Sequence, residues 1–292
     1  MNLDQLAILI VTFKSDQILS DLLIKLQKFN VVIIENSNNE NFKQVITRKY
    51  PNVKCILTNS NIGFGRALNI AFQRFKYQNY LILNPDIKIT EDQVIQVYSK
   101  AISNDDISVI APSTVSIKNK LTIRHGNFKL SKQQNSKYKE LIKVDYVSGH
   151  AFLIKQHVLN KVGYFDDKFF LNFEEHDLFF RIKKKGLNVY VMKDCSIVHF
   201  EGRSSDKKYF RETSLLSKWH YGWGYFFFFN KHYNKFFSIF FSLNFFLITL
   251  IKFLTYYFKK DHFKKDLMFY TLMGMLAAFK NQKSYYRFDN LI

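Results

Sequence analysis

The sequence predicts an α/β fold in which a parallel sheet comes first and helices come last. Continuous apolar runs of strand length recur through the first 83 residues, beginning with residues 6–11, and such runs are typical of strands buried on both faces. Segments with helically spaced apolar residues lie between them, joined by short polar loops. Beyond residue 205 the composition shifts sharply to Phe, Tyr and Lys. We therefore expect an α/β domain over residues 1–205 and a helical region over residues 206–292.

The first half of the chain alternates predicted strands with predicted helices. The strands are expected at residues 6–11, 31–34, 53–57 and 80–83, and the helices at about 16–29, from about 40, and at 61–75. Such alternation implies right-handed crossovers and a parallel sheet, whose ligands bind beyond the carboxyl ends of the strands. The loops at those ends carry Thr12, Glu35-Asn36, Asn61-Ile62-Gly63 and Asn84-Pro85-Asp86.

After residue 105 the pattern changes to strands with fewer helices, which predicts a mixed sheet. Strands are expected near residues 107–111, 121–125, 144–148 and 188–192, and helices near 155–162 and 174–185. No Ser/Gly-rich linker and no internal repeat interrupts this part of the chain.

The formal net charge of +19 raises the possibility of nucleic-acid binding. We find no zinc-finger, helix-turn-helix or RNA-binding aromatic motif, so no nucleic-acid partner is expected. Much of the basic excess lies after residue 200 among phenylalanines, which fits an anionic membrane surface better. Biased codon usage is the alternative explanation for the abundance of Lys, Asn, Ile and Phe.

The two cysteines and the N-terminus limit the compartment. Cys55 lies in an apolar run, so we expect it and Cys195 to be reduced thiols rather than a disulfide, and two cysteines exclude a metal site built on this residue type. The apolar stretch near the N-terminus is too short for a secretory signal. We therefore expect the α/β domain to remain in the cytoplasm.

One carboxylate follows the fourth predicted strand, at Asp86 after Pro85. A carboxylate at such a strand end can hold Mg²⁺ or Mn²⁺, ions that take few protein ligands when substrate phosphates supply the others. The alternative is a Pro-Asp turn in which Asp86 caps the next segment. His199, isolated after a later strand, is either a packed residue or a second ligand of the same ion.

Three acids, Glu174, Glu175 and Asp177, open a predicted helix that ends in three lysines. The helix macrodipole favours acids at a helix N-terminus, so one interpretation is that these three acids have a structural role. A carboxylate beside apolar walls can instead have its proton affinity tuned for general-base catalysis, and Phe169-Phe170-Leu171 precede this cluster.

Taken together, these segments resemble the family-2 bacterial glycosyltransferases of GT-A fold, and most closely their rhamnosyltransferase-like members. The GT-A fold combines a Rossmann-like nucleotide-binding half with a mixed central sheet. The segments that carry the resemblance are 11–13, 34–37, 61–69, 83–86, 147–154, 162–166, 170–181 and 198–199.

The resemblance implies a role for each of these segments. The implied contacts to the nucleotide sugar come from Thr12, Phe13, Glu35, Asn36, Asn61, Gly63, Arg66, Asn84, Asp86, Gly149 and His150. Glu35 stands where the family usually has Asp, and Asn84 replaces the first Asp of the metal-binding motif. Asp86 and His199 are the implied ligands of Mn²⁺ or Mg²⁺.

The implied reaction is an inverting single displacement. Glu175 is the implied catalytic base, and Glu174 remains an alternative. No covalent intermediate is needed, which agrees with the absence of a Ser or Cys nucleophile motif.

Residues 236–258 carry a single charge, Lys252, and are long enough to span a membrane. At helical spacing, however, their polar residues cluster on one face: Ser238, Ser242, Thr249, Lys252, Tyr256 and Lys259. We expect an amphipathic helix in the membrane interface, flanked by Lys231, Lys235, Lys259, Lys260, Lys264 and Lys265. A second apolar helix at 267–279, with small residues such as Gly274, is expected to pack closely against it. A spanning helix and an ordinary core helix remain alternatives.

The sequence thus predicts a peripheral enzyme on the cytoplasmic face of a bacterial inner membrane. As the resemblance implies, it transfers a sugar, first L-rhamnose from dTDP-L-rhamnose, onto a polyprenyl-diphosphate-linked saccharide of O-antigen or capsule. One alternative is a UDP-sugar-dependent galactofuranosyl- or hexosaminyltransferase. Another is a catalytically silent nucleotide-sugar-binding scaffold. A nucleotidyltransferase lacks support, because no Gly/Lys-rich phosphate loop follows the first strand.

Overall fold

The computed structural model describes residues 1–15, 19–115, 121–122, 125–128, 136–200 and 207–287. The chain forms two compact units. The sheet unit comprises Met1–Ile62, Ala67–Phe165 and Leu178–Asp206, and the helical unit comprises Gly63–Arg66, Asp166–Asp177 and Lys207–Ile292. The domain boundary expected at residues 205/206 lies outside the described residues.

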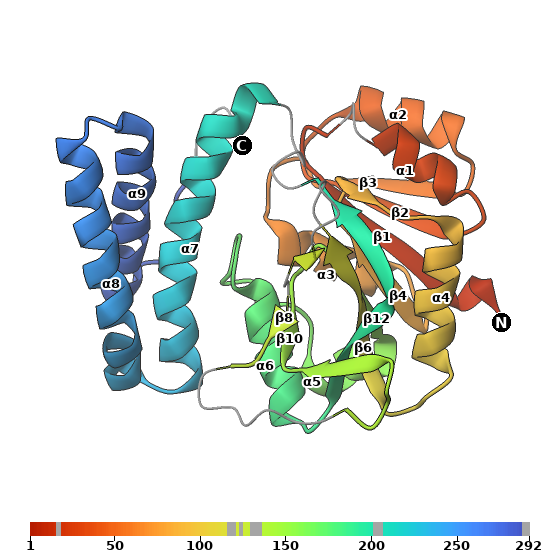
Figure 1. Ribbon diagram of the computed structural model, residues 1–292. Coiled ribbons are helices and arrows are strands. Elements are labelled where there is room, and N and C mark those ends of the chain that lie inside the picture. Colours follow the sequence, from red (N-terminus) through yellow and green to blue (C-terminus); the bar gives the residue numbers. More distant parts are fainter. Residues whose placement is uncertain (16–18, 116–120, 123–124, 129–135, 201–206, 288–292) are drawn as a thin grey trace. The chain divides into compact units, whose positions relative to one another are not determined.

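The sheet unit begins with the predicted parallel strands. They are β1 (Leu6–Thr12), β2 (Asn30–Glu35), β3 (Val53–Leu57) and β4 (Asn79–Leu83), in the order β3-β2-β1-β4 (Figure 1). The connecting helices are α1 (Leu19–Lys25), α2 (Glu40–Lys49) and α3 (Phe64–Arg74). All three pairings are parallel, so this part of the prediction is confirmed. Residues 16–18 of the first predicted helix lie outside the described part of the chain.

The sheet continues as the mixed sheet that the sequence predicts. β11 (Ala151–Lys155) is antiparallel to β4 and to β6 (Ile107–Val115), and β12 (Asn188–His199) is parallel to β6. Short strands complete it: β5 (Ile87–Lys88) and β9 (Leu141–Val144) pair with β12, and β7 (Leu121–Thr122) pairs with β6. A 3-10 helix, η1 (Leu3–Gln5), precedes β1. β8 (His125–Gly126) and β10 (Tyr146–Val147) form a separate pair.

Several elements differ from the sequence prediction. The predicted strand 121–125 is two short strands, with residues 123–124 outside the described set, and 144–148 is divided between β9 and β10. β12 continues beyond residue 192 to His199, through an irregularity between Met192 and Ser196. α4 (Glu91–Ile102), which the sequence analysis did not predict, begins with a capping box of Thr90 and Gln93. The remaining helices, α5 (Gln156–Val162) and α6 (Glu174–Lys184), lie where expected.

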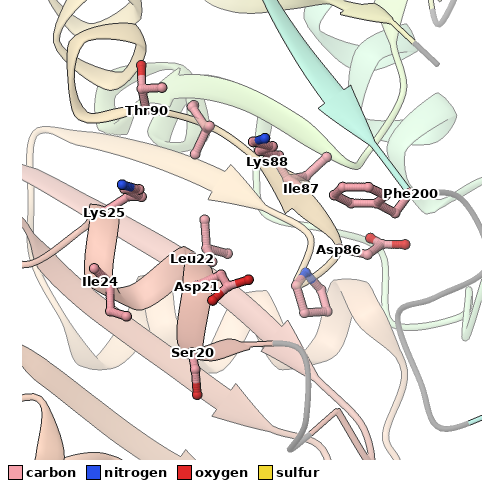
Figure 2. Close-up of a pocket in the computed structure, with 12 residues that line it drawn as sticks. Ser20, Asp21, Leu22, Ile24, Lys25, Asp86, Ile87, Lys88, Thr90 and Phe200 are labelled. Atoms are coloured by element: carbon pink, nitrogen blue, oxygen red, sulfur yellow. The ribbon is translucent and has the colours of Figure 1, made fainter. Parts of the chain in front are cut away.

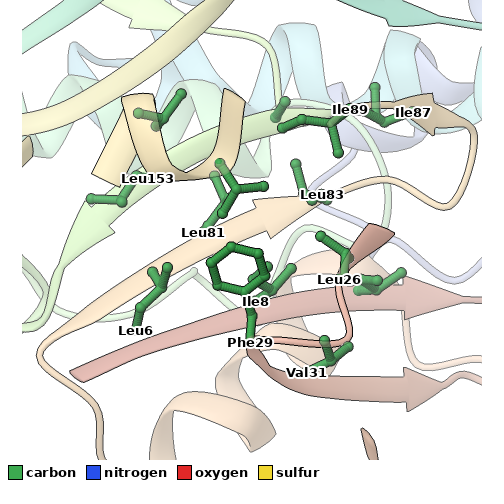
Figure 3. Close-up of a cluster of buried hydrophobic side chains, with 14 of the residues drawn as sticks. Leu6, Ile8, Leu26, Phe29, Val31, Leu81, Leu83, Ile87, Ile89 and Leu153 are labelled. Atoms are coloured by element: carbon green, nitrogen blue, oxygen red, sulfur yellow. The ribbon is translucent and has the colours of Figure 1, made fainter. Parts of the chain in front are cut away.

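The core of the sheet unit lies between the sheet and the helices α1, α2 and α4. Leu6, Ile8 and Leu81 are fully buried there, and Figure 3 shows them with residues from neighbouring elements. Apolar strands buried on both faces explain why the sequence reads as continuous apolar runs rather than as an alternating pattern. Cys55 and Cys195 are both free thiols.

The helical unit contains η2 (Lys207–Tyr209), α7 (Phe210–His232), α8 (Lys235–Phe258) and α9 (His262–Phe279) (Figure 1). Gly274 of α9 lies directly against α7, where an added Cβ would be 2.0 Å from the Trp219 carbonyl oxygen. Gly222 of α7 is equally close to Thr271 of α9. α9 also packs against α8, as the sequence predicts for the second apolar helix. Gly274 itself allows the close approach of α9 to α7.

The faces of α8 are reversed relative to a helix of a water-soluble protein. Ser238, Ser242 and Thr249 from the predicted polar face are buried in the helical unit. Large apolar side chains point outward, with Phe240 65% and Ile251 62% exposed. By length and composition, α8 is the one described helix that could span a membrane. The predicted clustering of polar residues exists, but part of the cluster faces protein and not water.

Candidate active site

The adjacent ends of β1 and β2 carry the first predicted site residues. Thr12 and Glu35 are register partners, and the Thr12 hydroxyl donates a hydrogen bond to the Glu35 carboxylate. Ser37 Oγ donates to the other carboxylate oxygen at 2.6 Å. Glu35 is fully buried, and both of its carboxyl oxygens accept hydrogen bonds from hydroxyl groups, as buried polar groups require.

Asn36 organises the loops next to Glu35. Its side-chain oxygen accepts hydrogen bonds from Thr58 Oγ1 at 3.0 Å and from the Ile62 amide at 3.1 Å, while its Nδ2 donates to Asn61 Oδ1 at 3.1 Å. The structure thus brings Thr12, Glu35, Asn36 and Asn61 into one hydrogen-bonded group. Phe13 follows Thr12 and is half-buried.

Asp86 and His199 meet although 113 positions separate them in the chain. β12 ends antiparallel to β5, with His199 opposite Ile87, and the Phe200 amide donates to the Asp86 carbonyl at 3.0 Å. This pairing places His199 Nε2 3.2 Å from Asp86 Oδ1. The Asp86 side chain is 1% exposed and that of His199 13% exposed.

His150 completes this cluster of the sheet unit. Its ring stacks on that of His199 with centroids 4.7 Å apart, and its Nε2 lies 2.7 Å from the Thr114 hydroxyl. Asn84 is tied to the same turn, because its amide donates to the His150 carbonyl at 2.8 Å. Gly149 lies in the half-buried turn before β11. Thr114 has no distinctive sequence motif around it, so its position here could not be predicted.

The donor atoms of this cluster suit a hard divalent cation. A carboxylate and an imidazole are ligands that Mn²⁺ and Mg²⁺ accept, with substrate oxygens completing the shell. Within the described residues, the buried His199 Nδ1 has no hydrogen-bond partner. No group of three or more His, Cys, Asp or Glu that could hold a metal occurs among those residues. Asp86 and His199 therefore fit an ion that is shared with a substrate, and not a fully protein-bound one.

Asp86 also lines a cavity of about 690 Å³ beside α1 and β5. Figure 2 shows Asp86 next to Phe200, with Asp21 and Leu22 of α1 on the opposite wall. The space is large enough for part of a nucleotide sugar.

The acidic cluster belongs to the helical unit and follows a strained backbone. Asn172 and Phe173 both have left-handed conformations, with φ of 64° and 69°, which is unusual for a bulky side chain. The Asn172 amide donates to the Ser217 carbonyl at 3.0 Å, and the Phe173 ring packs against Tyr221 and Tyr225. Such strain is held by its surroundings and clusters at functional sites.

Glu174 and Glu175 differ in burial. Glu174 is 3% exposed, whereas Glu175 is half-buried. Burial, and secondarily the charge of Glu175, raise the pKa of Glu174 well above its usual range. Glu174 is thus protonated in a range where an ordinary carboxyl is charged. Because Glu174 is buried and has a raised pKa, the more accessible Glu175 is the better proton acceptor of the two.

Gly63 and Arg66 also group with the helical unit. Gly63 has φ of 92°, and an added Cβ would lie 2.2 Å from the Phe170 carbonyl oxygen. That oxygen accepts a hydrogen bond from the Phe64 amide at 3.3 Å. Arg66 Nε donates to the Asp167 carbonyl at 2.7 Å. Gly63 therefore has a packing role, whatever its contact with a nucleotide.

Lys231, near the end of α7, forms ion pairs with two acids of the helical unit. Its ammonium group is 2.6 Å from Asp166 Oδ2 and also contacts Asp177, whose carboxylate is 2.7 Å from His232 Nε2. Lys231 precedes α8 as expected, and its charge is paired with Asp166 and with the buried Asp177. Its contact with a membrane stays a prediction. The sequence offers no spacing signal for this pairing across more than 50 positions.

The mixed sheet and the strand-end residues define the protein as a glycosyltransferase of GT-A fold. A mannosyltransferase from Pyrobaculum calidifontis, solved in complex with GDP-Man and Mn²⁺, shares this fold with a TM-score of 0.59 and 10% identity. The alignment covers 96% of this chain and 88% of that one. A family model described as glycosyl transferase family 2 matches residues 8–163, and the chain belongs to this family.

Two relatives are similar over roughly two thirds of this chain. The low-salt glycan biosynthesis hexosyltransferase Agl10 of Haloferax volcanii is 22% identical over 210 residues, which cover 68% of this chain and 67% of the relative. The N-acetylglucosaminyl-diphospho-decaprenol L-rhamnosyltransferase of Mycobacterium tuberculosis is 22% identical over 218 residues, or 61% of this chain and 68% of the relative.

Proposed function

We propose that this glycosyltransferase is an inverting, metal-dependent enzyme that transfers a sugar from a nucleotide sugar to a lipid-linked saccharide. L-Rhamnose from dTDP-L-rhamnose is the first candidate donor, and surface polysaccharide such as O-antigen or capsule is the product. The observation that carries the proposal is the buried pair of Asp86 and His199, 3.2 Å apart at the ends of β4 and β12.

Asp86 and His199 would hold Mn²⁺ or Mg²⁺. When bound, such an ion neutralises the charge of a departing diphosphate. The mannosyltransferase neighbour was solved with Mn²⁺, which supports a divalent ion here. Thr12, Glu35, Asn36 and Asn61 are the proposed nucleotide contacts, together with Phe13, Gly63 and Arg66.

Glu175 is the proposed general base. Its role is to accept the proton of the acceptor hydroxyl as that oxygen attacks the anomeric carbon, while the bond from this carbon to the diphosphate breaks. A single displacement of this kind inverts the anomeric centre. The raised pKa of Glu174 supports Glu175 rather than Glu174, since a protonated carboxyl cannot accept the proton.

The donor and acceptor are proposed from the relatives. The mycobacterial relative is named as a rhamnosyltransferase acting on a diphospho-decaprenol-linked sugar, which supports rhamnose and a polyprenyl-linked acceptor. The haloarchaeal relative is named as a hexosyltransferase, which keeps a UDP-sugar-dependent transfer as the second candidate.

The outward apolar face of α8 supports a peripheral place on the cytoplasmic face of the inner membrane. Phe240, Leu243 and Ile251 are each more than half exposed, and lysines follow the helix at its C-terminal end. Apolar residues beside basic ones suit an anionic bilayer surface.

The test is calorimetric binding of dTDP, UDP and GDP to the full chain, each with and without Mn²⁺. We expect Mn²⁺-dependent binding of dTDP to be the tightest, and Asp86→Asn to weaken it by about tenfold or more. Asp105→Asn, at an exposed aspartate of the same unit, is the matched control and should bind like the wild type.

A preference for UDP would favour the hexosyl alternative. Binding that is independent of metal for all three nucleotides would overturn the roles of Asp86 and His199 and leave a silent scaffold as the better explanation.

A further inference from the structure

A second cavity, of about 550 Å³, lies wholly within the helical unit. Its walls include Trp223 and Phe227 of α7 and Ala278 of α9, and its rim is the segment of residues 281–287. Four basic side chains line it: Arg66, Lys168, Lys283 and Arg287. Asp167 is the single acidic residue among the lining residues.

Arg287 is fixed in this cavity by several contacts. Its guanidinium carbon is 3.2 Å from the centroid of the Phe170 ring, and its Nη1 donates to the Tyr286 carbonyl at 2.7 Å. His220 of α7 lies 3.2 Å from the same nitrogen and 2.8 Å from the Ser284 hydroxyl. A guanidinium stacked on a ring in this way is preorganised, so a ligand would not have to immobilise a flexible side chain.

The four basic side chains of this cavity outnumber its single carboxylate, Asp167. Arg66, Arg287, Lys168 and Lys283 form no ion pair among the described residues, whereas Lys231 and Arg211 of the same unit are paired with acids. Burial, followed by the charge of Arg66, lowers the pKa of Arg287 to about 10. The positive charges of Arg66 and Arg287 disfavour each other, and an anion bound between them would stabilise both.

We infer that this cavity binds the diphosphate group of the lipid-linked acceptor, with Arg287 as its principal ligand. A diphosphate carries enough negative charge to match several cations, whereas a single carboxylate does not. The volume exceeds that of a diphosphate, so an adjoining sugar or prenyl segment can contact Trp223 and Phe227. This inference rests on the proposed transfer to a lipid-linked acceptor.

Both substrates of the proposed reaction carry a diphosphate, and two observations favour the acceptor. Most of the proposed donor contacts, among them Asp86, Thr12 and Glu35, belong to the sheet unit, whereas the cavity shares the helical unit with Glu175. Ala278 in its wall is followed by Phe279, which is 43% exposed on α9. Exposed apolar surface of this kind suits the hydrocarbon part of a lipid-linked acceptor and not a nucleotide.

The experiment measures three ligands on the wild type and on Arg287→Gln. Inorganic pyrophosphate and farnesyl diphosphate are titrated in the presence of EDTA, and dTDP in the presence of Mn²⁺. We expect the affinity for both metal-free diphosphates to fall by roughly tenfold or more, because charge-assisted hydrogen bonds are lost. We expect farnesyl diphosphate to bind more tightly than pyrophosphate, and the affinity for dTDP to be unchanged.

Two further variants keep the result interpretable. Arg287→Lys retains the charge but loses the planar fork, and should give an intermediate loss. Arg211→Gln removes an arginine of the same unit that is paired with Asp266 outside the cavity, and should bind like the wild type. Thermal unfolding of each variant shows whether the helical unit remains folded.

An equal loss of dTDP affinity in Arg287→Gln would assign the cavity to the donor and overturn the inference. Unchanged binding of both metal-free diphosphates, or none by the wild type, would also overturn it. Metal-dependent dTDP binding tests the proposed function separately, so either idea can fail while the other stands.

Discussion

Two adjacent carboxylates in the first turn of α6 have different environments. Glu174 is buried and its pKa is raised, first by burial and then by the charge of Glu175. Glu175 is half-buried. The same residue type at neighbouring positions can therefore serve as a neutral structural group and as a base, as its surroundings dictate.

Glutamine substitutions separate these roles. Glu175→Gln should lower kcat by roughly a hundredfold to ten-thousandfold, as expected for loss of a general base. Glu174→Gln should retain most activity, because the amide resembles the protonated acid in shape. Initial rates of nucleotide release measure both, and equal losses would contradict the assignment.

The pH dependence of stability provides an independent readout for Glu174. Its pKa is higher in the folded than in the unfolded chain, so its contribution to stability is fully present below 4.5 and is lost as the pH rises through the raised value. The Glu174→Gln variant has no titrating group at this position, so it does not lose this stability as the pH rises. Its free energy of unfolding should therefore increase relative to that of the wild type as the pH rises above 4.5, as denaturant titrations can measure. A difference that is constant over this range would contradict the raised pKa.

The pairing of Asp86 with His199 is the residue-level feature that the sequence anticipated best. Both follow apolar runs that end at one edge of a sheet, so strand order alone limits where they lie. Arg287 was not anticipated, because its position depends on how residues 281–287 fold over His220 and Trp223. No periodicity in the sequence predicts that this C-terminal segment folds back onto α7.

At the scale of elements, the closest helix contact is between α7 and α9. A Cβ on Gly274 would meet the Trp219 carbonyl and the Trp223 amide nitrogen, at 2.0 and 2.9 Å. Backbone atoms cannot move aside as a flexible side chain can, so the helices must separate.

Gly274→Ala should therefore destabilise the protein by about 1–3 kcal/mol, despite the higher helix propensity of alanine. Chemical denaturation measures this change. Met273→Ala, at the exposed neighbouring position, is the control and should stay within about 0.5 kcal/mol. An unchanged midpoint for Gly274→Ala would contradict the close approach.

The sequence predicted α8 and its polar arc but not the direction that this arc faces. Helical spacing fixes which residues share a face, whereas the partner that the face meets depends on tertiary packing. Here Ser238, Ser242 and Thr249 are small enough to let α8 lie against the other helices. The sequence predicted a helical region over residues 206–292 but gave no bounds for α7, because aromatic residues surround that helix on all sides and leave no amphipathic period.

At the scale of the whole molecule, the exposed apolar side chains of α8 predict binding to lipid. Replacing Phe240 and Ile251 together with serine should weaken binding to anionic phospholipid vesicles by at least about tenfold, because each buried side chain of this size contributes ~1.5–3 kcal/mol. Vesicle co-sedimentation measures the change, and added salt should reduce binding by the wild type.

The matched control replaces Val45 and Ile102, two exposed apolar residues of the sheet unit, with serine. It should bind vesicles like the wild type. Equal binding by the α8 variant would show that this face does not contact lipid.

The parallel half of the fold was predictable because each strand and helix there has its own local pattern. The mixed part of the sheet was less predictable from the sequence. β11 and β5 are short, and they are strands because β4, β6 and β12 offer them hydrogen-bonding edges. The small residue sets that distinguish one donor sugar from another are likewise not visible as a pattern in the chain.

The hydrogen bonds between residues 284–287 and His220 have a practical consequence for preparing the protein. A chain cut after residue 283 would lose Ser284 and Arg287, and with them the hydrogen bonds to His220. An affinity tag is therefore better attached at Met1, which is 59% exposed.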